Sequence, residues 1–219
     1  MAAVFALRFA AKAQLNDSGV EKMGEKVTSV MIVGVGGQGT LLASRLLGAA
    51  MMGQGHDVKV SEVHGMSQRG GSVVTYVRYG EKVYSPIIEE GEADLILAFE
   101  QLEAARFLPY LKEGGTVVVN TQQIDPMSVV TGAAAYPEAL IEKIQACGAD
   151  VLAMDALALA EQAGSVKAVN VVLIGAMAKK LGYGSELWLQ AIRETVPAKF
   201  LELNEKAFAL GYAHAENSF

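Results

Sequence analysis

The chain has very little cysteine, since Cys147 is the only one among its 219 residues. A lone cysteine cannot form a disulfide within the chain, and it cannot supply the thiolate set that holds an iron–sulfur cluster. No Cys/His grouping with the spacing of a zinc site occurs either. Any metal or cluster redox chemistry in which this protein takes part must therefore reside on another chain.

Charged residues are also scarce, and basic residues are the scarcer kind. Charged side chains make up 19% of the sequence, and 18 basic against 24 acidic residues leave a net charge of −6. Such a balance disfavours electrostatic binding of nucleic acid or anionic lipid over a broad surface, although a small local anion site stays possible. The 52% hydrophobic content excludes disorder and allows a full core.

Long apolar runs are missing as well, so we expect no membrane partner and a cytoplasmic protein. The first fifteen residues contain Arg8 and Lys12 but no acid, as a transit peptide or weak signal sequence does. Translation starting at Met23 would explain this segment equally well. We expect residues 1–26 to be a disordered or loosely ordered extension and residues 27–219 to form a single domain.

Strand and helix patterns alternate through that domain. Most strand patterns are continuous apolar runs, which indicates a sheet covered on both faces. The sequence therefore predicts an α/β three-layer sandwich with a mainly parallel Rossmann-like sheet, a β-hairpin and C-terminal helices that pack on the sheet or extend toward a partner. The expected strands are 27–33, 58–63, 72–79, 94–99, 115–120 and 150–154, and the expected helices are 40–52, 101–111, 137–147, 156–163 and the chain from 169 onward. A turn at Gly80-Glu81 predicts that 72–79 pairs with 82–84 in the hairpin.

A glycine loop follows the first expected strand. Gly34, Gly36, Gly37, Gln38 and Gly39 fit GxGxxG between a strand and a helix. Glycines let the backbone approach a ligand, and free N–H groups at a helix N-terminus favour an anion such as a phosphate. The Gln38 amide adds a further donor. An ATPase is disfavoured because the P-loop lysine is missing.

Two other interpretations of this loop remain open. A dinucleotide site would require an acid about twenty residues further on for the ribose hydroxyls, and Glu62 is the candidate. Alternatively, the glycines only allow close packing of strand against helix.

A second glycine-containing loop, residues 64–71, follows the second expected strand. In a parallel sheet it lies at the same carboxyl edge as the first loop, so both should face one cleft. Arg69 offers a bidentate fork for phosphate or carboxylate, and Gly70 lets the chain turn beside it. Alternatively, the double glycine is only a turn and Arg69 a surface ion pair. His64 carries little weight, because no catalytic triad accompanies it.

These two loops carry a resemblance to a known family. GVGGQGTLLASRLLG at 34–48 and SEVHGMSQRGGSV at 61–73 together resemble the gamma-type domain of the 2-oxoacid:ferredoxin oxidoreductases. The resemblance continues through 92–100, 114–121 and 167–182, so it covers the chain from about Val27 onward. Many members have an acid where this chain has Gln68. The Gln-Arg-Gly-Gly form resembles the indolepyruvate or aryl-pyruvate branch, with pyruvate, 2-oxoglutarate and branched-chain 2-oxoacids as alternatives.

The resemblance implies that the complex decarboxylates a 2-oxoacid on thiamine diphosphate, passes electrons through iron–sulfur clusters to ferredoxin and releases an acyl-CoA. This chain lacks the cluster cysteines and the GDG…NN signature that binds magnesium and diphosphate. Thiamine diphosphate, magnesium and the clusters are thus expected on a larger alpha subunit, in a heterodimer or heterotetramer. The reacting centre would lie on that partner, and this chain would be a non-redox subunit, inactive alone.

In the family this domain is associated with coenzyme A. We therefore hypothesise that the first loop presents donors to CoA phosphates or to the neighbouring subunit, with Arg69 as the counter-charge. The predicted cofactor-binding residues are Gly34, Gly36, Gly37, Gln38, Gly39, Ser67, Gln68, Arg69 and Gly70.

Weaker candidates are Ser67, Glu100, Asn120 and Asn170, each of which would otherwise cap a helix or close a turn. Two other classes of function stay open. One is a free-standing NAD- or nucleotide-binding protein that uses Glu62, and the other is a purely structural subunit without a ligand.

Overall fold

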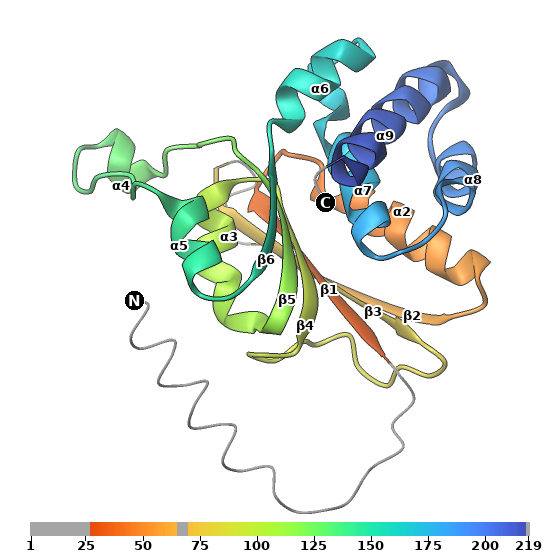
Figure 1. Cartoon of the computed structure of the whole chain (residues 1–219), viewed down its shortest axis with the longest axis horizontal. Coiled ribbons are helices and arrows are strands. Elements are labelled where there is room, and N and C mark those ends of the chain that lie inside the picture. The colour runs from red at the N-terminus through yellow and green to blue at the C-terminus, as the bar shows by residue number, and fades with distance from the viewer. Residues whose placement is uncertain (1–26, 65–69, 218–219) are drawn as a thin grey trace, which may run out of the picture.

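Figure 1 shows the computed structural model, which describes residues 27–64 and 70–217. Six strands form one sheet in the order β2-β3-β1-β4-β5-β6, and β3 alone is antiparallel to its neighbours. The strands are β1 (Thr28–Val35), β2 (Asp57–His64), β3 (Ser72–Gly80), β4 (Ala93–Ala98), β5 (Leu111–Asn120) and β6 (Asp150–Met154). The prediction of a mainly parallel α/β sheet is confirmed.

Helices cover both faces of this sheet, as the apolar strands require. The helices are α2 (Thr40–Gly53), α3 (Gln101–Phe107), α4 (Met127–Val130), α5 (Leu140–Ala146), α6 (Ala156–Ala163), α7 (Val169–Lys180), α8 (Ser185–Thr195) and α9 (Leu201–Glu216). One core cluster joins α2, α6, α7, α8 and α9 to one face, and a second joins α3 and α5 to the other. Within the first, α2 and α7 contact the strands, while α8 and α9 pack on those two helices.

The predicted hairpin between 72–79 and 82–84 is wrong. β3 pairs with β1 along one edge and with β2 along the other, so it has no free edge for a third partner. Residues 82–84 instead form an irregular segment, in which the Val83 N–H donates to the Asp57 carboxylate at 2.9 Å. The antiparallel pairs in this fold are β3 with β2 and β3 with β1.

Element boundaries differ from the prediction around residues 111 and 140. The helix expected over 101–111 ends at Phe107, and the strand expected from 115 already begins at Leu111. The helix expected from Pro137 begins only at Leu140, directly after Ala139, which has a positive φ of 53°. β6 and α6 match their predicted ranges. Within the described ranges, no helix is both long and apolar enough to cross a membrane.

Candidate functional site

The two glycine loops meet at the carboxyl edge of the sheet. β2 and β1 run in the same direction because β3 is antiparallel to both. The backbone N–H of Gly36, within the first loop, donates to the carbonyl of Gly71 at the end of the second loop at 2.9 Å. The prediction that the loops share one edge is confirmed. Gly70 has a φ of +77°, whereas Ser67, Gln68 and Arg69 lie outside the described residues.

The first loop presents backbone donors at the start of α2. Gly37 and Gly39 have φ values of +100° and +88°, a conformation that favours glycine. In the described part of the chain, the N–H groups of Gly37, Gly39, Thr40 and Leu41 have no protein acceptor, as the first turn of a helix leaves them. Together with the helix dipole, these groups can bind an anion.

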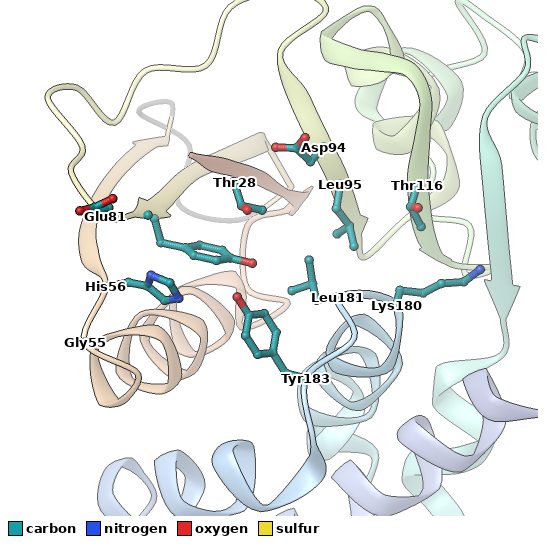
Figure 2. Close-up of a pocket in the computed structure, with 12 residues that line it drawn as sticks. Thr28, Gly55, His56, Glu81, Asp94, Leu95, Thr116, Lys180, Leu181 and Tyr183 are labelled. Atoms are coloured by element: carbon teal, nitrogen blue, oxygen red, sulfur yellow. The ribbon is translucent and has the colours of Figure 1, made fainter. Parts of the chain in front are cut away.

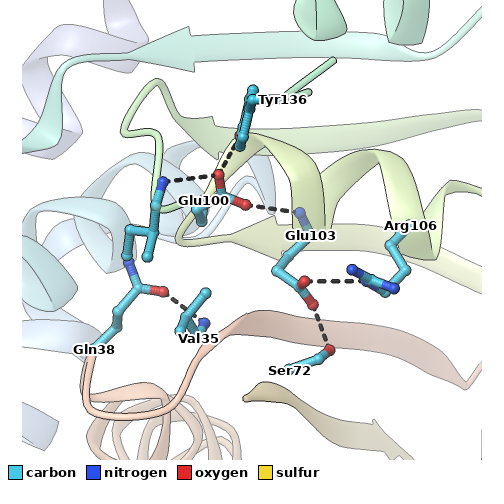
Figure 3. A network of polar contacts seen from close by, with 8 residues as sticks. Val35, Gln38, Ser72, Glu100, Glu103, Arg106 and Tyr136 are labelled. Atoms are coloured by element: carbon cyan, nitrogen blue, oxygen red, sulfur yellow. Dashed lines mark hydrogen bonds and ion pairs between the residues drawn. The ribbon is translucent and has the colours of Figure 1, made fainter. Parts of the chain in front are cut away.

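Gln38 has its hydrogen bonds inside the protein. Its Oε1 accepts from the N–H of Val35 at 2.7 Å, while its Nε2 donates to the Phe99 carbonyl at 3.1 Å and to Oε1 of Gln122 at 3.3 Å. Figure 3 shows the Gln38 side chain turned back toward Val35. Gly34 makes room for this, because a Cβ there would lie 2.8 Å from Oε1 of Gln38. Gln38 therefore stabilises the conformation of the loop at the end of β1.

Asn120 extends this arrangement across the sheet edge. It is only 1% exposed, and its Nδ2 donates to the same Phe99 carbonyl at 3.3 Å. Its Oδ1 accepts from the N–H of Ala156 at 3.2 Å, at the start of α6. Asn120 thus links the ends of β4 and β5 to the start of α6, which is the capping alternative for this residue.

Asn170 lies against the glycine loop from the other side. It is 8% exposed in the first turn of α7, and a Cβ at Gly39 would lie 2.6 Å from its Nδ2. The Oδ1 of Asn170 accepts from the N–H of Val171 at 2.9 Å. The structure therefore brings Asn170 to the first loop, as a packing neighbour of Gly39.

Two buried carboxylates stand beside the loops (Figure 3). Glu100 is 1% exposed, and it accepts from the N–H groups of Glu103 at 2.9 Å and Ile124 at 3.3 Å and from the Tyr136 hydroxyl. Glu103 accepts from Arg106 at 3.0 Å and from the hydroxyl of Ser72, the first residue of β3. Burial, and then the hydrogen bond to Glu100, raise the pKa of Tyr136, so its phenol stays protonated and donates.

Sequence reasoning missed Glu103, Gln122 and Tyr136. Glu100-x-x-Glu103 directly after a buried strand resembles a capping box, and Glu100 is indeed the N-cap residue of α3. That spacing could have indicated an ordered acid pair at this edge. No local pattern marks the contact of Gln122 with Gln38 or of Tyr136 with Glu100, because each pair is distant in the sequence.

Glu62 does not lie where a dinucleotide-binding acid would. β3 intervenes between β2 and β1, so Glu62 pairs with Thr75 of β3 rather than standing on the strand next to the glycine loop. Two strand spacings place it about 10 Å away from β1. This strand order argues against an NAD site that uses Glu62.

A cavity of about 700 Å³ lies at the opposite, amino edge of the sheet (Figure 2). Tyr79, Tyr183, His56 and Thr28 line it beside Lys180. Burial raises the pKa of the Tyr79 phenol, which keeps it protonated, and Lys180 pairs with Asp150 at 2.9 Å. The candidate site is instead the carboxyl edge, where the two glycine loops meet.

Fold and site together define a class: a Rossmann-like α/β protein with a glycine loop between the first strand and the first helix of its sheet, and a single cysteine. The family model of pyruvate ferredoxin/flavodoxin oxidoreductase matches residues 29–214. The chain therefore belongs to this family.

Relatives and solved structures agree with that assignment. The indolepyruvate oxidoreductase subunit IorB of Thermococcus kodakarensis is 45% identical over 198 residues, covering 87% of this chain and 97% of that protein. The gamma subunit of a keto/oxoacid ferredoxin oxidoreductase from Geobacter sulfurreducens superposes with a TM-score of 0.66 at 25% identity, over 87% of this chain and 99% of that one.

The 2-oxoglutarate:ferredoxin oxidoreductase of Magnetococcus marinus, solved with 2-oxoglutarate, coenzyme A and succinyl-CoA bound, shares the fold. Its TM-score is 0.69 at 19% identity, over 88% of this chain but only 32% of that one. In that enzyme the fold is thus about one third of a longer chain.

Proposed function

We propose that this chain is the small, non-redox subunit of an indolepyruvate or aryl-pyruvate:ferredoxin oxidoreductase, which converts the 2-oxoacid to an acyl-CoA. The observation that carries the proposal is the 45% identity to an indolepyruvate oxidoreductase subunit over almost that subunit's whole length. The Gln68-Arg69-Gly70-Gly71 sequence supports the same branch.

The redox and decarboxylation groups belong on a larger partner subunit in this proposal. Cys147 is the only cysteine of the sequence, so the chain does not fit an iron–sulfur cluster. Among the described residues, no group of three or more His, Cys, Asp or Glu side chains could hold a metal ion. Thiamine diphosphate, magnesium and the clusters are therefore assigned to the partner, and ferredoxin would act on the assembled complex.

The contribution of this chain would be part of the coenzyme A site. The backbone N–H groups of Gly37 and Gly39 and the first turn of α2 are suited to a phosphate, with Arg69 of the second loop as the counter-charge. Because Gln38 has internal partners, its role in this scheme is to hold the loop rather than to contact CoA.

Two measurements test the proposal in order. The full-length chain is first co-expressed with the thiamine- and cluster-bearing subunit of the same genome, and the purified complex is assayed with indolepyruvate, CoA and ferredoxin. A stable complex that reduces ferredoxin only when CoA and an aryl pyruvate are present is the expected result. Failure of the two chains to associate would refute the subunit assignment.

The CoA contact is tested by Arg69→Ala in that complex. Loss of a charged hydrogen bond to phosphate should raise the Michaelis constant for CoA by roughly 10- to 100-fold, with little change in kcat. Arg193→Ala is the matched control, because Arg193 is on outer helix α8 and pairs with Glu186 and Glu205. An unchanged constant for Arg69→Ala would remove Arg69 from the site.

A further inference from the structure

An exposed arm leaves the carboxyl edge between β5 and α5. No residue from 121 to 139 is buried, and Figure 1 shows α4 projecting from the body within this segment. Met127 is 71% exposed and Val130 65%. We call residues 121–139 the arm. Among the large aliphatic side chains of the described residues, these two are the most exposed.

The arm is closed at its base by one buried carboxylate. Oε1 of Glu100 accepts from the N–H of Ile124 and from the hydroxyl of Tyr136, so both ends of Ile124–Tyr136 meet at one atom. Inside the arm, the Thr131 hydroxyl donates to the Met127 carbonyl at 2.8 Å. Compact loops of about 6–16 residues with adjoining ends often serve in recognition. Met127 and Val130 are therefore displayed on an ordered segment.

The base of the arm is also connected to the glycine loop. Gln122 lies just before Ile124, and its Oε1 accepts from Nε2 of Gln38 at 3.3 Å and from Nδ2 of Asn120 at 3.4 Å. A protein that covers the arm would therefore stand next to the loop to which the proposed function assigns CoA.

The charges of the arm favour one kind of occupant. Its charged residues are Asp125 and Glu138, both acidic, and the whole chain has a net charge of −6. A second copy docked through the same arm would bring these like charges together, whereas a partner with an apolar, neutral or basic receiving surface would not. In the Magnetococcus marinus enzyme this fold occupies about a third of a longer chain, so the fold there adjoins a larger body.

We propose that the arm is the docking element for the larger subunit, with Met127 and Val130 inserted into an apolar surface of that partner. This inference rests on the proposed function, because the larger subunit is the partner which that proposal assigns to the chain. Removing two such side chains from water on binding is enough to change the affinity by more than tenfold.

The test compares substitutions on the arm with a substitution at the C-terminal end of α2. Met127→Asp and Val130→Asp place a charge on the arm, while Met52→Asp places one on a methionine that is 60% exposed at the far end of α2. Each full-length variant is titrated against the tagged larger subunit, and its thermal melt is recorded alone. We expect the arm variants to bind at least tenfold more weakly with an unchanged melt, and Met52→Asp to bind like the wild type.

The other outcomes separate this inference from the proposed function. If the wild type does not bind the larger subunit, both fail. If the wild type, Met52→Asp and both arm variants bind equally well, the arm assignment alone is overturned. If the isolated wild-type chain is a dimer in light scattering and Met127→Asp makes it monomeric, the occupant is a second copy and the assignment to the larger subunit is refuted.

Discussion

Gly39 of the glycine loop and Asn170 of α7 are in direct contact. A Cβ on Gly39 would lie 2.6 Å from Nδ2 of Asn170, a separation that real Cβ atoms essentially never show. Gly39 also has a φ of +88°, so both its conformation and its surroundings require glycine. The first turn of α2 is thus seated against the first turn of α7.

We expect Gly39→Ala to destabilise the protein more than Gly37→Ala does. Both glycines have positive φ, so either alanine costs about 1–2 kcal/mol in backbone strain. Only at Gly39 does the new Cβ meet a buried side chain, whereas nothing lies within 4 Å of a Cβ at Gly37. Urea unfolding of the two variants measures the difference.

A second substitution identifies the cause of that difference. Asn170→Ala in the Gly39→Ala background should recover part of the lost stability, because it removes the atom that the Cβ meets. If the double variant loses as much free energy of unfolding as the two single variants together, the contact between Gly39 and Asn170 does not cause the difference.

Gln38 offers a test between a structural and a ligand-binding role. Gln38→Glu replaces the Nε2 donor by an oxygen that faces the Phe99 carbonyl, so we expect a loss of about 1–3 kcal/mol in the free energy of unfolding. Gln145→Glu is the control, since Gln145 is exposed on α5. An unchanged stability together with a raised Michaelis constant for CoA would instead make Gln38 a ligand donor.

Much of the fold follows from local patterns. Continuous apolar strands predicted a sheet covered on both faces, and β6 and α6 fell within their predicted bounds. The order of the strands in the sheet did not follow from these local patterns. The insertion of β3 between β1 and β2 depends on pairings between segments distant in the chain, which neither periodicity nor turn chemistry specifies.

The site was predictable in position but not in its internal bonds. Both glycine loops were placed at one sheet edge, and the Gly36–Gly71 hydrogen bond confirms this. That Gln38 turns inward could not be foreseen, because its partners Phe99 and Gln122 lie in the segments that follow β4 and β5, far from it in the sequence. An exposed glutamine and an internally bonded one look identical in a sequence.

Tyr136→Phe should loosen the base of the arm. Removing the hydroxyl leaves the buried Glu100 carboxylate with one donor fewer, which we expect to cost about 1–2 kcal/mol at neutral pH. Tyr84→Phe is the control, because Tyr84 is 87% exposed. Equal free energies of unfolding for the two variants would contradict the bond to Glu100.

The same variant has a defined pH dependence. Burial, and then Glu100, raise the pKa of Tyr136 above its ordinary value of 10.0, so the folded state favours the protonated phenol. The stability that this preference contributes is present below pH 10 and is lost as the pH rises above it. Wild-type protein should therefore lose stability faster than Tyr136→Phe above pH 10, as chemical denaturation at pH 9 and 10.5 would detect.

Gly211 of α9 lies where α9 crosses α7 at backbone distance. A Cβ there would fall on the Val172 carbonyl, far inside the 3.0 Å below which something must shift. On α7, a Cβ at Gly175 would likewise clash with the Phe208 carbonyl of α9. Neither helix therefore has room for a side chain at the crossing. Gly211→Ala should therefore separate the helices and cost about 3 kcal/mol or more, despite the better helix propensity of alanine.

Gly48 supplies the matched control for this substitution. It is also a buried glycine inside a helix, but a Cβ there would only touch Val58 at 4.0 Å. Gly48→Ala should thus gain up to about 1 kcal/mol from helix propensity alone. Opposite signs in the free energy of unfolding are expected for the two variants, and a loss of similar size at both positions would show that buried glycine replacement, not the α7–α9 crossing, is responsible.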